Sequence, residues 1–391
     1  MPWKEVKPMD EKVFFISDYL RGSQNFTDLC CSYGISRRTG YKWVSRYLED
    51  GAEGLHNRST APKRQPHQTP YYIRKSIIQI RKRKKIRLGP SKIQTLLMEE
   101  YSEDEVPSHT TIYNILRSEG LITSRKRKRR VPPMPQPFDT VKEPNDVWTA
   151  DYKGQFLTKD GKWCYPLTIM DYQSRYLLQC KGHERISTDS AKKTFEEVFR
   201  KYGLPNRIRT DNGVPFATRS LGGISCLSKW WIRLGIFPER IKPGQPQQNG
   251  VHERMHRTLK DSAIKPPGRN LKHQQRLFNG FVQEYNEDRP HDALQNKKPS
   301  SRYHRSTREY PKKLPDLEYP GHYHVTSVSH GGIMYCFGSI VYTRHVFAGE
   351  RVGMEEVQDG VWKVYFGPIC LGRFDQRDTM KSKYGYCSLK V

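Results

Sequence analysis

Three acidic residues lie where the direction of the chain is expected to change. Asp151 falls in a strand-like segment, Asp211 ends another in the sequence TDNG, and Glu253 begins a helix-like segment after the turn-forming residues 243–250. In the sequence, 59 residues separate the first two and 41 separate the last two. Grouped carboxylates would suit Mg²⁺, which prefers oxygen ligands to nitrogen or sulfur. The chain has 41 acidic residues, and most such residues are solvated, so spacing alone does not select these three.

The histidines beside Glu253 allow a second chemistry. Residues 252–256 read HERMH, which matches the pattern H-E-x-x-H, where two histidines bind zinc and the glutamate is the general base. In the metzincin class, Gly and His would follow where this chain has Leu259 and Ser262. A five-residue motif also recurs by chance, so zinc proteolysis is kept here only as an alternative.

The elements that must position these residues lie between about 140 and 305. The hydrophobic patterns and turn residues predict strands at 148–157, 163–180 and 207–211, and helices at 187–202, 227–234 and from 251 onward. Strands that come first and then alternate with helices predict a mixed α/β sheet flanked by helices. Trp230 and Trp231 fall in an apolar helix and are predicted to be core residues.

A small all-α unit is predicted for residues 1–54. Its first helix would bury Val13, Ile16 and Leu20, and its third, residues 37–48, follows a short turn. This arrangement is typical of a helix-turn-helix, which inserts one helix into the DNA major groove. The residues expected to face outward and contact DNA are Arg37, Arg38, Thr39 and Lys42. A three-helix bundle with a solvated basic face is the alternative.

A linker at 55–69 leads to a second helix-turn-helix unit, winged-helix-like, at 70–124. Its last helix is expected to begin after Pro107 and Ser108. The residues expected to contact DNA there are His109, Thr110, Tyr113 and Asn114. A basic and proline-containing linker follows at 125–139, and its first residues include Arg125, Lys126 and Arg127. This run either lies along DNA phosphates or is a solvated charge run.

The composition indicates a polyanionic partner. The 68 Lys and Arg residues outnumber the 41 Asp and Glu residues and give a net charge of +27, whereas small domains carry a charge of about 2 to 8 in magnitude. Double-stranded DNA is therefore the expected partner. The N-terminal residues lack the apolar stretch of a signal peptide, and no apolar run is long enough to span a membrane. We expect a cytoplasmic, nucleoid-associated protein without a membrane partner.

Four segments resemble the integrase core of DDE-type insertion-sequence transposases and retroviral integrases. They read WTADYKG, IMDYQSRY, RTDNGVPF and PGQPQQNGVHERMHRTLK. A fifth, YNEDRPHDAL at 285–294, resembles the segment that follows this core in the insertion-sequence branch. The resemblance covers about 140–305 and implies an RNase H-like fold. After it, the alternating pattern of 320–391 predicts a small all-β, barrel-like domain.

The resemblance implies that Asp151, Asp211 and Glu253 are the catalytic and metal-binding residues, holding two Mg²⁺ or Mn²⁺ ions. A family member would bind the terminal repeats of a mobile element, cleave DNA to expose 3′-hydroxyls and join them to target DNA, acting as a homo-oligomer of at least two subunits. Asp171, in DYQSRY, lies outside this triad and is expected to be structural, with Arg175 as a partner. A catalytically silent DNA-binding regulator on the same fold is the alternative.

Two further expectations concern the third acidic residue and its surroundings. His256, Arg257 and Lys260 follow Glu253 at offsets of three, four and seven, so we expect them on one helix face with it, against DNA. The 41-residue gap before Glu253 is longer than is usual in the family, and we assign the excess to an insertion that includes residues 221–226, LGGISC.

The first helix-turn-helix unit is tested by changing Arg37, Thr39 and Lys42 together to alanine. Loss of a base-reading arginine should weaken binding by about 1 to 3 kcal/mol, and loss of a phosphate-binding lysine should flatten its salt dependence. Fluorescence anisotropy with labelled duplex DNA at several salt concentrations measures both effects. Unchanged affinity, selectivity and salt dependence would remove this unit from DNA recognition.

Overall fold

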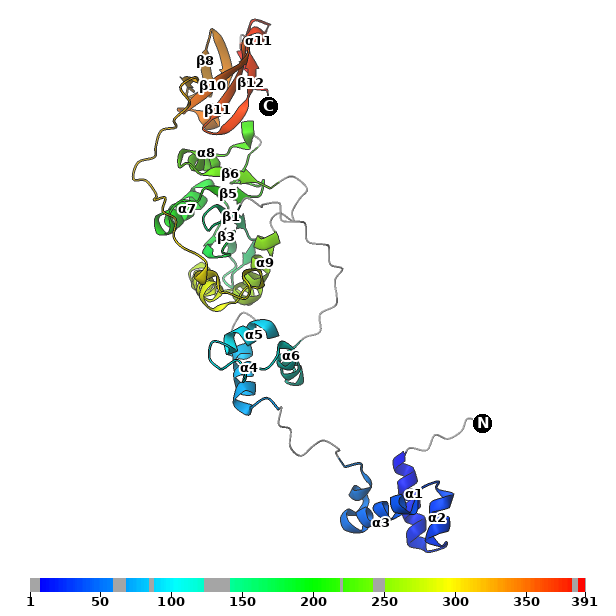
Figure 1. Cartoon of the computed structure of the whole chain (residues 1–391). Helices are drawn as coiled ribbons and strands as arrows, with labels where there is room; N and C mark the ends of the chain where they lie inside the picture. Colours follow the sequence, from blue (N-terminus) through cyan, green and yellow to red (C-terminus); the bar gives the residue numbers. More distant parts are fainter. Residues whose placement is uncertain are drawn as a thin grey trace. The chain divides into compact units, whose positions relative to one another are not determined.

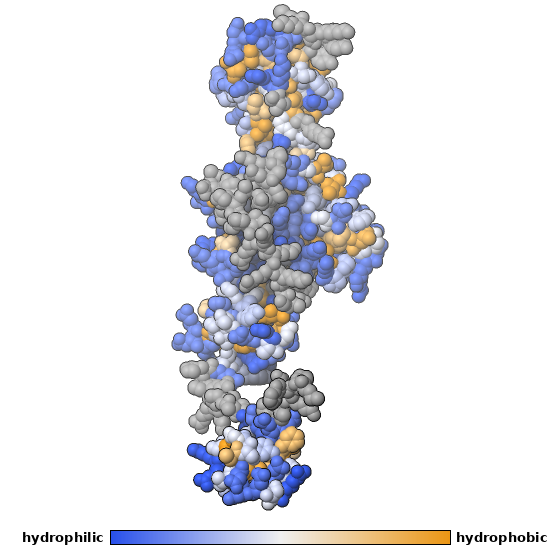
Figure 2. Space-filling view, turned by 90° about the vertical axis from the view of Figure 1, so that its right-hand side faces the viewer, coloured by the Kyte–Doolittle hydropathy of each residue, from blue (hydrophilic) through white to orange (hydrophobic). Residues whose placement is uncertain are grey.

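The computed structural model describes residues 8–58, 68–83, 88–122, 141–218, 221–241, 250–381 and 386–390. It comprises two compact units, residues 1–68 and residues 69–391 (Figure 1). Hydrophilic residues dominate the face drawn in Figure 2, as the charge of +27 would suggest. Among the helices in the described ranges, none has the length and apolar character needed to cross a membrane. The expected DNA contacts Arg125, Lys126 and Arg127 lie outside the described residues.

The N-terminal unit is a three-helix bundle. Its elements are α1 (Pro8–Arg21), α2 (Phe26–Ser32), α3 (Arg37–Asp50) and the short 3₁₀ helix η1 (Gly51–Leu55). The side chain of Asn25 accepts a hydrogen bond from the backbone N–H of Thr27 and begins α2, as the sequence predicts. Ser36 begins α3 in the same way, through the N–H of Thr39. These caps fix the turn between the second and third helices.

The buried face of α1 differs from the predicted one. Ile16 is buried as expected, but Val13 and Leu20 are 46 % and 57 % exposed, so that part of the prediction is wrong. Phe15 takes their place in the core, where its ring meets the rings of Phe26 and Tyr33 at centroid distances of 6.3 and 5.5 Å. Aromatic side chains on α2 and directly after it therefore pack against Phe15, so that α1 buries the face that carries this residue. Helical spacing alone does not determine which face of a helix is buried.

The second unit begins with another group of three helices. They are α4 (Tyr71–Arg83), α5 (Pro90–Leu97) and α6 (His109–Ser118). Ser108 caps α6 by accepting a hydrogen bond from the N–H of Thr111. The apolar residues of these helices form one continuous cluster with residues of later helices, such as Phe281. An ion pair of 2.8 Å between Lys298 and Glu99 adds a polar link to the same later segment.

A six-stranded mixed sheet forms the centre of the second unit. Its strands are β1 (Val147–Tyr152), β2 (Phe156–Leu157), β3 (Trp163–Asp171), β4 (Leu177–His183), β5 (Arg207–Thr210) and β6 (Phe237–Arg240). The order is β2-β3-β1-β5-β6, and β4 also pairs with β3. Strands β1, β3 and β4 are antiparallel neighbours, whereas β5 and β6 continue the sheet parallel to β1.

Helices cover both faces of this sheet. They are α7 (Thr188–Tyr202), α8 (Cys226–Arg233), α9 (Gly250–Leu259), the π-helix η4 (Lys260–Ile264), α10 (Leu271–Gln283) and the π-helix η5 (Glu284–Asp288). Figure 1 shows α7 and α9 on opposite sides of β1 and β3. Because side chains alternate along a strand, Trp148 and Ala150 join the core beneath α7 and α8, and Thr149 and Asp151 point to the other face. Trp230 and Trp231 are core residues, as predicted.

Two small sheets form the C-terminal region. The strands are β7 (His324–Ser327), β8 (Ile333–Cys336), β9 (Ser339–Tyr342), β10 (Arg351–Gln358), β11 (Val361–Phe366), β12 (Ile369–Asp375) and β13 (Tyr386–Ser388). Strands β12-β11-β10-β7 form one sheet and β13-β9-β8 the other.

The second unit also contains short helices in its described residues. They are η2 (Leu221–Gly223), η6 (Asp292–Leu294), η7 (Pro299–Ser301), η8 (His345–Phe347) and α11 (Gln376–Lys381).

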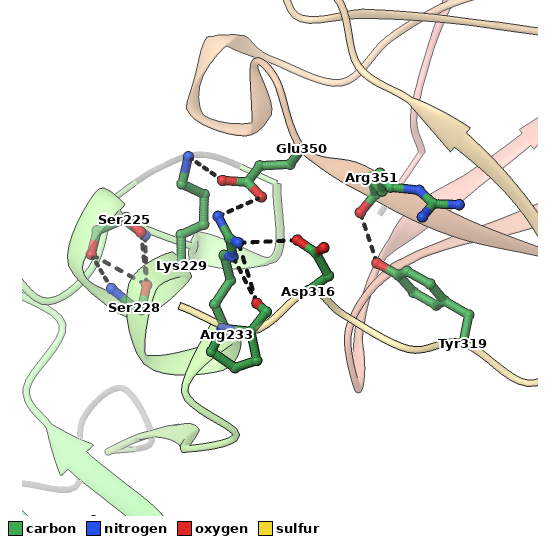
Figure 3. A network of polar contacts seen from close by, with 9 residues as sticks. Ser225, Ser228, Lys229, Arg233, Asp316, Tyr319, Glu350 and Arg351 are labelled. Atoms are coloured by element: carbon green, nitrogen blue, oxygen red, sulfur yellow. Dashed lines mark hydrogen bonds and ion pairs between the residues drawn. The ribbon is translucent and has the colours of Figure 1, made fainter. Parts of the chain in front are cut away.

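The residues assigned to an insertion lie against this C-terminal region. Leu221 and Ile224 are buried in its apolar cluster, together with Ile232 from α8. On the same helix, Lys229 and Arg233 form ion pairs of 3.0 and 3.7 Å with Glu350, which precedes β10 (Figure 3). The contacts thus give the insertion a packing role that the sequence did not reveal. The fold class itself is confirmed, with helical N-terminal units, an α/β core and a sheet-rich C-terminal region.

The corrected face of α1 can be tested with two matched aliphatic truncations. Ile16→Ala should destabilise the N-terminal unit by about 2 to 5 kcal/mol, because it opens a cavity in the core. Leu20→Ala should change stability by no more than about 0.5 kcal/mol, because this side chain is exposed. Hydrogen exchange of the α1–α3 amides in the full chain measures both. Equal effects of the two substitutions would contradict the observed packing.

Candidate active site

Two of the three predicted acidic residues lie on, or directly after, neighbouring strands of the sheet. Strands β1 and β5 run parallel, with Ala150 opposite Thr210. The next residues, Asp151 and Asp211, therefore reach the same edge of the sheet from neighbouring strands. One oxygen of Asp211 accepts a hydrogen bond of 3.1 Å from the N–H of Gly213, which orients its carboxylate.

The third acidic residue is carried by a helix that is hydrogen-bonded to the sheet through its histidines. His252 Nδ1 lies 3.0 Å from the hydroxyl of Thr149, and its Nε2 lies 2.6 Å from the hydroxyl of Thr168. His256 Nε2 lies 2.8 Å from the same Thr168 hydroxyl. The two threonines lie on the face of β1 and β3 that Asp151 shares. The helix α9, with Glu253 exposed in its first turn, is thus fixed to the two strands.

The threonine hydroxyls of this cluster have more hydrogen-bond acceptors nearby than hydrogens to donate. The Thr168 hydroxyl lies 3.0 Å from the backbone oxygen of Asp151, and the Thr149 hydroxyl lies 3.3 Å from that of Met170. Each hydroxyl carries one hydrogen and can also accept, so the two hydroxyls can pair with either tautomer of the histidine rings. The Nδ1 of His256 lies 3.8 Å from a carboxylate oxygen of Asp151, beside the acidic residues.

Burial keeps both histidines neutral. It lowers the pKa of His252 to about 3. It also lowers the pKa of His256 to about 2, with further contributions from His252 and from the positive charge of Lys153. Because threonine hydroxyls occupy both ring nitrogens of His252, the geometry favours an anchoring role for the HERMH histidines over zinc ligation. Within the described residues, no group of three His, Cys, Asp or Glu side chains is close enough together to hold a metal ion, and this applies to the three acidic residues as well as to the histidines.

Comparison with known families agrees with this arrangement of the sheet and α9. A family model described as an integrase core domain matches residues 141–246, and a second model with the same description matches 234–299. Residues 141–299 therefore contain an integrase core domain. A homeodomain-like model matches residues 39–116, and a helix-turn-helix model matches 11–63. The integrase core is thus preceded by DNA-binding modules.

Proteins of two insertion elements are similar to much of the chain. The uncharacterized 31.7 kDa protein of IS407 from Burkholderia multivorans is 28 % identical over 214 residues, which are 54 % of this chain and 75 % of that protein. The 39.2 kDa protein of IS476 from Xanthomonas euvesicatoria is 24 % identical over 53 % of this chain, and the match spans 58 % of its length. Both relatives are thus proteins of insertion elements.

The chain is also similar to a solved structure, at low identity. The catalytic core domain of HTLV-2 integrase, in complex with magnesium, is 16 % identical and covers 41 % of this chain and 98 % of its own, with a TM-score of 0.33.

One residue predicted to face DNA from α9 is buried instead. His256 is only 7 % exposed, and its ring points to Thr168, so the expectation that it shares an exposed face with Glu253 is wrong. Arg257 and Lys260 are exposed, as expected. The reason is that His256 lies one turn after His252, on the stripe of α9 that packs on the sheet. A histidine is expected in solvent because it is polar, but here a strand supplies a buried hydrogen-bond partner for His256.

The predicted DNA-contacting residues of the two helical units are mostly exposed. Arg37, Arg38 and Lys42 are exposed on α3, whereas Thr39 is half-buried and its hydroxyl is 3.0 Å from that of Ser36. On α6, the exposed residues include His109, Thr110, Tyr113 and Asn114. Their contacts with DNA stay predictions.

The rival carboxylate in the core has a structural environment, as predicted. Asp171 is fully buried and accepts hydrogen bonds from the backbone N–H groups of Asn145 and Ser174, at 2.8 and 2.7 Å. Burial raises the pKa of Asp171, and these hydrogen bonds together with the charge of Arg175 oppose that effect. Its carboxylate therefore fixes the end of β3 and is enclosed away from solvent.

Sequence reasoning missed Thr149 and Thr168, which hold the active-site helix. Neither residue is charged, and in the motif WTADYKG the aspartate was singled out while Thr149 was not. A signal was nevertheless present, because Thr149 lies two residues before Asp151 and therefore on the same face of the strand. The partner across β3 could not be identified without the register, which pairs Asp151 with Thr168.

The hydroxyl at the centre of this cluster can be removed without a change of shape. Thr168→Val should destabilise the protein by about 1 to 3 kcal/mol, because buried polar groups lose their partner, and should lower DNA cleavage because α9 is no longer fixed. Thr168→Ser keeps the hydroxyl and should retain most of both. Thermal unfolding and a cleavage assay measure the two effects. Equal behaviour of the valine and serine variants would contradict the role of the hydroxyl.

Proposed function

We propose that this chain is a transposase that binds the two ends of a mobile element, cleaves the DNA to expose 3′-hydroxyls and joins these to target DNA. The observation that carries the proposal is the pairing of β1 with β5, which brings Asp151 and Asp211 to one edge of the sheet beside the fixed helix of Glu253. The similarity to insertion-element proteins supports it.

We propose that Asp151, Asp211 and Glu253 hold two divalent ions, Mg²⁺ or Mn²⁺. The donor set fits such ions, which prefer carboxylates, water and phosphate oxygens, and the similar HTLV-2 integrase core was solved with magnesium. When bound, two such ions would stabilise the attacking and leaving oxygens of an in-line displacement. The part of this chain is to present the carboxylates. The Thr168 hydroxyl holds α9, and Nδ1 of His256 lies beside Asp151.

DNA recognition is proposed to rest on the two helix-turn-helix units and the basic surface. Both units match models of DNA-binding domains, and the net charge of +27 favours phosphate contacts throughout the chain. Two element ends must be held together for coordinated joining, so we propose a complex of at least two subunits on DNA. Terminal repeats of the element are the proposed specific sites.

The acidic residues are tested by Asp151→Asn, Asp211→Asn and Glu253→Gln. Each change keeps the size of the side chain and removes the charge that would offset a divalent ion, so cleavage and joining should both fall by several orders of magnitude. Binding to DNA should persist or improve, because repulsion between carboxylate and phosphate decreases. Binding, nicking and joining are scored separately with labelled DNA and a target plasmid, with and without Mg²⁺.

The matched control is Asp261→Asn, which removes an exposed carboxylate just after α9 and should leave cleavage and joining unchanged. Ca²⁺ should support assembly with little turnover, because it is larger and looser in geometry than Mg²⁺. Near-normal joining by Glu253→Gln, or cleavage by the unaltered protein without any divalent ion, would refute the assignment. A protein that binds DNA but never cleaves it would instead be a regulator.

A further inference from the structure

A group of four cations, three of them partly buried and one exposed, lies at the active-site helix, outside the acidic triad. Its members come from four segments: Lys92 from α5, Arg175 from the turn between β3 and β4, Arg254 from α9 and Arg289 from the residues after η5. Arg254 directly follows Glu253. Arg175 and Arg289 belong to the sequence segments DYQSRY and YNEDRPHDAL, to which the proposed chemistry gives no task.

Hydrogen bonds hold these segments together. The side chain of Asn286 accepts a hydrogen bond of 2.8 Å from the N–H of Leu177 and donates one of 2.9 Å to its oxygen. This ties η5 to the strand that follows Arg175. The ring of Tyr285 is buried against that of His291, with a centroid distance of 4.6 Å. On the other side, Lys92 reaches an oxygen of Asp292 at 3.7 Å.

Positive charge in the group exceeds negative charge. Burial lowers the pKa of Lys92, and the nearby charges of Arg289 and Arg254 lower it further, against the opposing effect of Asp292. Burial also lowers the pKa of Arg175, with a smaller contribution from Arg254. For Arg289, burial again dominates and is opposed by Tyr285, Asp292 and Glu284. Four cations thus share three carboxylates, Asp171, Glu284 and Asp292, and the last of these is 74 % exposed.

Two guanidinium nitrogens of the group have no hydrogen-bond partner within the described chain. They are Nη1 of Arg175 and Nη1 of Arg289, and both atoms are buried. A buried N–H group without a hydrogen-bond partner is unfavourable, and the neighbouring like charges add to this cost. Such a site is expected where an anion completes the hydrogen bonds. Guanidinium groups suit phosphate in particular, because they donate two parallel hydrogen bonds to it.

We propose that Lys92, Arg175, Arg254 and Arg289 form a binding site for a backbone phosphate of DNA. The inference rests on the proposed function, since it places this phosphate on the DNA that the transposase processes. Because Lys92 belongs to the second helix-turn-helix unit and Arg254 to α9, one phosphate would be contacted by the recognition unit and by the active-site helix together. The segment YNEDRPHDAL would then serve as a clamp on DNA through Arg289.

The site is tested first by removing single charges. Arg289→Gln and Lys92→Gln in the full chain should each weaken binding to a short random-sequence DNA duplex and lower the slope of log Kd against log salt by about 1, the value for one lost phosphate contact. Lys272→Gln is the matched control, because it removes an exposed charge from the nearby α10 and should leave the slope unchanged. Circular dichroism verifies that each variant folds.

A second variant tests the site in the opposite direction and does not require a change of a buried residue. Asp292→Asn removes the exposed carboxylate that competes for Lys92, so duplex binding should become tighter and its salt slope steeper. Asp316→Asn is its matched control, because Asp316 is 89 % exposed and pairs with Arg233 in the same manner, at 3.4 Å. This control should bind DNA as the unaltered protein does.

Unchanged affinity and slope in Asp292→Asn, or in folded Arg289→Gln and Lys92→Gln, would overturn the phosphate site. An equal loss of slope in Lys272→Gln would also overturn it, because any lost charge would then suffice. These outcomes are separate from failure of the proposed function, which would appear as absent Mg²⁺-dependent cleavage by the unaltered protein. The duplex-binding measurements need no divalent ion.

Discussion

The hydrogen bonds to the hydroxyl of Thr168 are the contacts on which the active site depends. One hydroxyl joins the backbone of Asp151 to two histidines of α9, so a strand and a helix that are distant in sequence hold a common position. The arrangement is stable because the threonine and histidine side chains are buried, the histidines are neutral, and the hydroxyls pair with the ring nitrogens. If α9 were held by apolar contacts alone, Glu253 could slide or turn relative to the sheet.

A small number of contacts also joins the other parts of the second unit. Leu221 and Ile224, from the longer segment before Glu253, are buried in the apolar cluster of the C-terminal region. Glu350 forms ion pairs with two basic residues of α8. On the other side, α5 brings Lys92 to the segment after η5. Both connections converge on the integrase core, which therefore contacts a helical unit on one side and a sheet-rich region on the other.

Much of the fold followed from local patterns. The capping residues Asn25 and Ser108 begin the helices that they predicted, and the apolar run around Trp231 is core. The failures have one cause. Val13 and His256 were placed by residue type and helical spacing, yet the face that a helix buries depends on its neighbours. Aromatic rings on and after α2 pack against Phe15 and so bury its face of α1. The hydroxyl of Thr168 pairs with the ring of His256 and keeps that side chain buried.

The sequence by itself determined the family, the excess of positive charge and the residue types available for metal and phosphate chemistry, because these depend on motifs and composition. Only the tertiary structure decided which groups meet. The parallel pairing of β1 with β5 sets Asp151 beside Asp211, and the register of β1 with β3 supplies Thr168 for the histidines. Such contacts join residues that are separated by up to about a hundred positions in the sequence. Contacts across that distance are fixed by packing and by strand register, which no local sequence pattern encodes.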